Sequence, residues 1–74
     1  MKLSKLKALE EELNSYLYGV VSAWHQGVMP TESEVWSHVE SVFSRVDSDR
    51  DRQQLQMNTV DLLGEALTYI RLDG

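Results

Sequence analysis

Hydrophobic residues recur along the chain at spacings of three, four and seven, the periodicity of a helix with one buried face. They do so in three stretches, at residues 4–26, 32–46 and 50–72. The hydrophobic positions of the first two stretches are Leu6, Leu9, Leu13, Tyr16, Leu17, Val20 and Trp24, followed by Val35, Trp36, Val39, Val42, Phe43 and Val46. No stretch alternates with the period of two that a strand would show. The pattern therefore predicts an all-α protein, more than half helical, folded as a single-domain three-helix bundle with Trp24, Trp36 and Phe43 in its core.

Local signals define both sides of the first connection. Gly27 lies where a glycine in the left-handed conformation commonly ends a helix. Thr31 and Glu34 have the spacing of a capping box, in which the threonine hydroxyl accepts from the glutamate amide and the glutamate carboxylate accepts from the threonine amide. We expect a short loop at residues 28–30 between the first and second helices.

The second connection is marked by a loss of hydrophobic residues. The hydrophobic stripe of the second stretch stops at Val46, and either Asp47 or Ser48 can cap a new helix, with Asp51 three residues after Ser48. We therefore expect a corner at residues 47–50. The alternative is one continuous helix over residues 32–72, about 60 Å long, since neither glycine nor proline interrupts the corner.

The third stretch carries two hydrophobic stripes. The first consists of Val60, Leu63, Leu67 and Ile70, and the second of Leu55, Leu62 and Tyr69, rotated by about 120° around the helix. We expect the first stripe to supply the core and the second to be spare surface. A spare stripe has three interpretations: a central helix that touches both others, a homodimer across a twofold axis, or a contact with a different protein. The predicted partner-binding residues are Leu55, Leu62, Ala66 and Tyr69, with Tyr18 as a lone exposed anchor on the first helix.

Length and composition restrict the class of protein. A chain of 74 residues, of which 42% are hydrophobic, is suited to one small folded domain. It contains no cysteine, so disulfides and thiolate metal sites are excluded, and a cytoplasmic location is favoured because small secreted domains usually contain disulfides. The hydrophobic runs fall far short of the roughly 20 residues that span a bilayer, and acidic residues follow the N-terminal lysines. We expect neither a membrane segment nor a signal peptide.

The acidic balance indicates the kind of partner. The net charge is −5, from 12 acidic and 7 basic residues. No basic face suited to nucleic acid is evident, so direct binding to DNA or RNA is disfavoured and a partner with a basic surface is favoured. The acidic surface is expected to include Glu10, Glu11, Glu12, Asp47, Asp49 and Asp51. Mimicry of a phosphate backbone is a further possibility, although a mimic usually carries a larger charge excess.

One acidic cluster resembles part of a calcium-binding loop. Asp47, Asp49 and Asp51 match its first three ligand positions. The match then fails, because Arg52 occupies the position that requires glycine and Asn58 the position that requires a bidentate glutamate. Helix capping and solvated charge explain the cluster better.

The sequence supports neither a metal centre nor catalysis. His25, Glu34 and His38 are a conceivable zinc set across the first connection, but no fourth ligand accompanies them. The chain has no cysteine nucleophile, no glycine-rich phosphate loop and no serine on a strand-to-helix turn. We expect no catalytic residue, no cofactor and no metal.

The prediction is a non-enzymatic protein-binding module. In its sharpest form it is a small acidic regulator or antagonist that covers a surface of a larger, nucleic-acid-handling protein, as small helical proteins of phages and mobile elements do. One alternative is a structural or assembly subunit that acts by self-association, with the third helix as the dimer interface. Another is a metal-dependent switch built on the two weak clusters.

Overall fold

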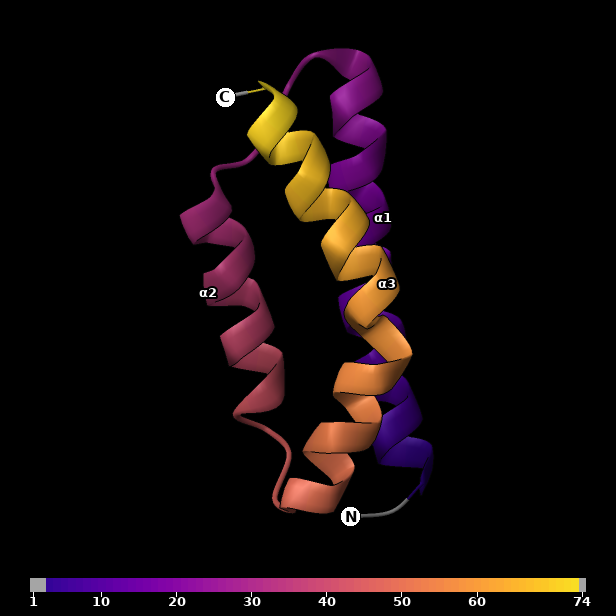
Figure 1. The fold of residues 1–74 in the computed structure, drawn as a ribbon. Helices are drawn as coiled ribbons and strands as arrows, with labels where there is room; N and C mark the ends of the chain where they lie inside the picture. Colours follow the sequence, from indigo (N-terminus) through magenta and orange to yellow (C-terminus); the bar gives the residue numbers. More distant parts are fainter. Residues whose placement is uncertain (1–2, 74) are drawn as a thin grey trace.

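The computed structural model describes residues 3–73, which form three α-helices: α1 (Leu3–Gln26), α2 (Glu32–Phe43) and α3 (Asp49–Asp73). These helices account for 86% of the structure, and no strand forms within residues 3–73. Helix α3 packs along α1, and the shorter α2 lies against this pair (Figure 1). The prediction of a small all-α three-helix bundle is confirmed.

The first connection has the predicted geometry. Gly27 adopts a φ of 78°, and its amide donates to the carbonyl of Trp24 over 3.2 Å, which ends α1. The amide of Glu34 donates to the Thr31 hydroxyl over 3.2 Å, and the amide of Thr31 donates to the Glu34 carboxylate over 3.3 Å. The reciprocal bonds of the capping box therefore start α2.

The corner between α2 and α3 also forms, so the alternative of one continuous helix is wrong. Helix α2 ends at Phe43 rather than at Val46, because the chain tightens there: the amide of Val46 donates to the carbonyl of Phe43 over 3.0 Å. Val46 is nevertheless buried. The Ser48 hydroxyl accepts from the amide of Asp51 over 3.3 Å and caps α3, as its position predicts.

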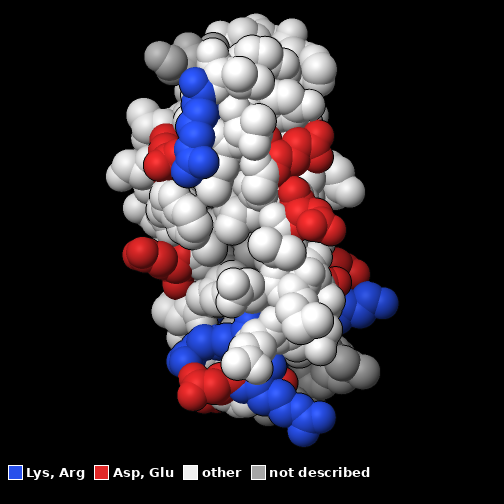
Figure 2. All heavy atoms as spheres, viewed as in Figure 1, with Lys and Arg blue, Asp and Glu red and all other residues white. Residues whose placement is uncertain are grey.

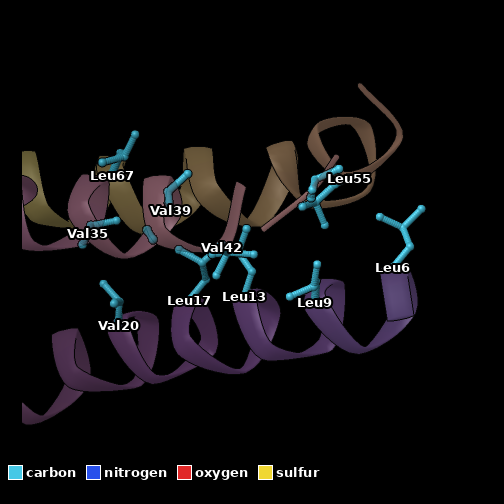
Figure 3. Close-up of a cluster of buried hydrophobic side chains, with 12 residues drawn as sticks. Leu6, Leu9, Leu13, Leu17, Val20, Val35, Val39, Val42, Leu55 and Leu67 are labelled. Atoms are coloured by element: carbon cyan, nitrogen blue, oxygen red, sulfur yellow. The ribbon is translucent and has the colours of Figure 1, made fainter. Parts of the chain in front are cut away.

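The core runs along the inner faces of all three helices (Figure 3). It is built from aliphatic side chains that are almost wholly excluded from solvent: Leu6, Leu9, Leu13, Leu17, Val20, Val35, Val39, Val42, Val46, Leu55, Ala66 and Leu67. One polar residue is buried among them, Thr59, whose hydroxyl donates to the carbonyl of Leu55 over 2.8 Å. This bond satisfies the hydroxyl without a partner from another helix.

The prediction about the two faces of α3 is wrong. Leu55 and Ala66 are fully buried, and Leu62 packs against the core. The ring of Tyr69 stacks on that of Trp24 in α1, with ring centroids 5.4 Å apart. Helix α3 lies along α1 on this side, so the stripe expected to be spare surface is its main packing face. Of the three interpretations of this stripe, the structure agrees with a helix that touches both others.

The stripe expected to be core turns partly outward. Val60 is 47% exposed, and Leu63 and Ile70 are only half-buried, while Leu67 is buried. Helix α2 is about half as long as α3 and covers this side incompletely. The surplus hydrophobic surface therefore exists, but it lies on the other of the two stripes, the one predicted to be core.

Candidate protein-binding groove

A groove of about 520 Å³ lies between α2 and α3. Its wall on α2 is made by Trp36, Val39, Glu40 and Phe43. Its wall on α3 is made by Gln56, Thr59, Val60, Leu63, Gly64 and Leu67. Most of these side chains are hydrophobic, so the groove is suited to another apolar surface rather than to a polar ligand.

The aromatic residues of α2 line this groove instead of filling the core. Trp36 is 40% exposed, so the prediction that it is a core residue is wrong. Phe43 is half-buried and packs against the core from the side of the groove. The inward face of α2 consists of Val35, Val39 and Val42. Because Trp36 and Phe43 each follow one of these valines, they lie about 100° further around the helix and reach the rim.

Polar contacts lie near both ends of the groove. The Arg71 guanidinium donates to the Glu32 carboxylate over 3.0 Å and joins the end of α3 to the start of α2. The Arg52 guanidinium donates to the carbonyl of Val46 over 3.1 Å and to the Asp49 carboxylate over 2.7 Å. The first contact joins α2 to α3, and the second joins α3 to the connection that precedes it.

The face that contains the groove is uncharged in the middle. Figure 2 shows acidic atoms on both sides of this white area and basic atoms toward its ends. Glu40 lines the groove from α2. On α3, Asp61 is exposed and lies about 60° beyond Gly64 around the helix, on the side away from α2. Carboxylates therefore flank an apolar centre.

The residues predicted to bind a partner do not line this groove. Leu55, Leu62, Ala66 and Tyr69 are committed to the packing of α3 on α1. Tyr18 is 63% exposed on α1, as expected, but it stands apart from the groove. Trp36 and Val60, which do line the groove, were both predicted to be core residues. For Trp36 the available signal was its position next to a core valine.

The predicted acidic residues lie on α1, in the connection before α3 and on α3, and several have partners. Glu12 on α1 pairs with Arg45, and Asp49 pairs with Arg52. Glu10 is half-buried beside the start of α3, where it shares a polar cleft with Asp51. Glu11 and Asp47 are exposed. Much of this acidic set is held in local structure rather than forming one open surface.

The histidines lie in two separate aromatic contacts. His25 meets the edge of the Tyr69 ring at 6.3 Å between centroids, whereas His38 stacks on Tyr16 at 3.8 Å. Burial raises the pKa of the Tyr16 phenol, and the charge of Glu34 raises it further. Within residues 3–73 no group of three or more His, Cys, Asp or Glu side chains is arranged to hold a metal ion, so neither the calcium set nor the zinc set is assembled.

Acid should weaken the contact between Glu12 and Arg45. The guanidinium of Arg45 donates hydrogen bonds to the Glu12 carboxylate and lowers its pKa; desolvation opposes this, and the charges of Arg45 and His38 lower the pKa further. A carboxyl with a lower pKa in the folded state stabilises that state above its unfolded pKa of about 4.3, and this stabilisation is lost as the pH falls through the folded pKa.

We expect Glu12→Gln to flatten the acid limb of a plot of the free energy of unfolding against pH. Glu11→Gln is the matched control. It removes the neighbouring exposed carboxylate, whereas Arg45 pairs with Glu12. Urea unfolding followed by circular dichroism between pH 3 and pH 7 measures both. Identical acid limbs for wild type and Glu12→Gln would contradict the expectation.

Comparison of the chain with family models, with curated proteins and with solved structures finds no match. None of the helices within residues 3–73 combines the length and the hydrophobicity that crossing a bilayer requires. The groove between α2 and α3 is therefore the feature from which function is argued.

Proposed function

We propose that the protein is a non-enzymatic protein-binding module that contacts its partner through the groove between α2 and α3. The supporting observation is the exposed hydrophobic surface of Trp36 and Val60 on opposite walls of one groove. Exposed hydrophobic patches of this kind commonly mark contact sites, and tryptophan is enriched among the residues that dominate binding energy.

The charge of the chain supports a partner with a basic surface. A net charge of −5 speeds association with a positively charged protein and disfavours nucleic acid as a direct ligand. An acidic regulator or antagonist of a nucleic-acid-handling protein is the form of the proposal that this charge favours.

The test compares two substitutions of the same kind. Val60→Gln removes hydrophobic surface inside the groove, whereas Val28→Gln does so at a residue that is 72% exposed in the loop after α1. Both variants should remain folded, because both positions are exposed. We expect the immobilised wild-type chain and the Val28→Gln variant to retain the same protein from an extract of the cells that make this chain. The amount retained by Val60→Gln should be about tenfold lower.

Light scattering on the same three proteins completes the test. Equal retention by Val60→Gln and wild type would contradict the groove as the contact surface. A wild-type dimer that Val60→Gln converts to monomer would identify self-association as the use of the groove.

A further inference from the structure

We propose that the occupant of the groove is an amphipathic helix whose apolar stripe is flanked by lysine or arginine. This proposal rests on the proposed function and specifies the partner. The relevant features are the apolar walls, the open space at Gly64 and the carboxylates of Glu40 and Asp61 on the two sides.

The shape of the groove suits a helix. Its α2 wall belongs to a helix of 12 residues, about 18 Å long, which would accompany about three turns of a partner helix. A helix bound in a groove inserts residues at positions i, i+3, i+4 and i+7, which lie on one side over that length. The walls on α2 and α3 would then hold the guest as a further helix of the bundle.

Gly64 provides the close approach that such packing needs. A Cβ atom added at Gly64 would meet no heavy atom within 4 Å, so no contact in the described part of the chain requires glycine there. Glycine inside a helix costs about 1 kcal/mol relative to alanine. At a groove-lining position, the missing side chain allows a guest backbone to approach α3.

The charge pattern favours a basic helix over a second copy of this chain. In a face-to-face dimer with a parallel twofold axis, the edge that carries Glu40 meets the edge that carries Asp61. If the twofold axis is instead perpendicular to the helices, the edge with Glu40 meets the Glu40 edge of the other copy, and the edge with Asp61 meets the other Asp61 edge. Either arrangement brings carboxylates together around a dry centre, which is unfavourable. A guest with lysines beside its apolar stripe places cations against both edges instead.

The first arm of the experiment uses three synthetic 14-residue helical peptides and the full chain. One peptide has leucines at i, i+3, i+4 and i+7 flanked by lysines, the second has the same leucines flanked by glutamates, and the third keeps the lysines but replaces the leucines with glutamine. Fluorescence anisotropy of labelled peptides gives the affinities. We expect the first peptide to bind at least about tenfold more tightly than either of the others at low salt.

The second arm of the experiment tests whether the peptide binds in the groove. Val60→Gln and Gly64→Leu should each weaken binding of the leucine–lysine peptide by about tenfold. The controls are Val28→Gln and Gly19→Leu, since Gly19 on α1 has equally open space and does not line the groove. Melting curves accompany each variant, and both leucine substitutions should raise the melting temperature because they replace a helical glycine.

The third arm tests the edges. Glu40→Gln combined with Asp61→Asn should weaken binding by a few-fold and reduce its salt dependence. Glu11→Gln should change the affinity and its salt dependence only as much as the loss of one distant charge would. Equal affinities for the peptides with lysine and glutamate flanks would overturn the proposal. So would an affinity for the leucine–lysine peptide that Val60→Gln and Gly64→Leu leave unchanged. A dimer that Val60→Gln dissociates would overturn the basic-helix occupant while upholding the groove as a protein-binding surface.

Discussion

Replacing Leu17 with alanine should lower the free energy of unfolding by about 3 to 5 kcal/mol. Leu17 is fully buried on α1, and Figure 3 shows its side chain directed toward Val39 and Val42. Alanine loses the transfer free energy of the leucine side chain and leaves a cavity that backbone movement fills only in part.

The small size of the protein makes this loss large in relative terms. A chain of 74 residues is expected to have a total stability of about 4 to 11 kcal/mol, so the variant should be close to its unfolding threshold at room temperature. Urea titration monitored by circular dichroism measures the change. Tyr18→Ala, at the adjacent residue that is 63% exposed, should change the free energy by less than about 0.5 kcal/mol. Equal effects at the two positions would mean that α1 is rotated relative to the structure described.

The helices and their ends were accessible from the sequence because their signals are local. The capping box of Thr31 and Glu34, the left-handed Gly27 and the Ser48 cap each depend on residues within three or four positions of one another. Such signals act before any tertiary contact forms. The existence of a corner follows from the same principle, although the connection spans residues 44–48 rather than the predicted 47–50.

The orientation of α3 was not accessible from large hydrophobic residues alone. The face packed against α1 reads Leu55, Thr59, Leu62, Ala66 and Tyr69, with alternating spacings of four and three. This is the spacing of helices packed nearly parallel, as in a coiled coil. Thr59 and Ala66 are weak hydrophobic signals, so the row resembled a sparse stripe of period seven. The hydroxyl of Thr59 bonds within its own helix, which allows a polar residue to occupy this row.

The groove depends on packing between segments that are far apart in sequence. A helix with valines on one side and aromatic residues one position later can turn either set inward, and tertiary contacts decide. Here the valines of α2 pack inward, while Trp36 and Phe43 line the opening toward α3. The ion pairs between distant segments, Glu12 with Arg45 and Glu32 with Arg71, follow no periodic pattern in the sequence.

A pair of identical substitutions on α3 should separate its two faces by several kcal/mol. Leu55→Glu places a carboxylate at a fully buried position, within a region where aliphatic side chains pack. A charge buried without a partner costs several kcal/mol, and protonation would recover only part of this. We expect Leu55→Glu to be largely unfolded, with little helical signal and no cooperative melting transition.

Val60→Glu should remain folded. Val60 is 47% exposed, so a carboxylate there stays in water, and glutamate has a higher helix propensity than valine. The free energy of unfolding should change by less than about 1 kcal/mol. Circular dichroism spectra and urea titrations of both variants give the comparison. If Val60→Glu unfolded and Leu55→Glu did not, Val60, Leu63 and Leu67 would form the core stripe of α3, and the groove would lose its status as the exposed hydrophobic surface from which binding is inferred.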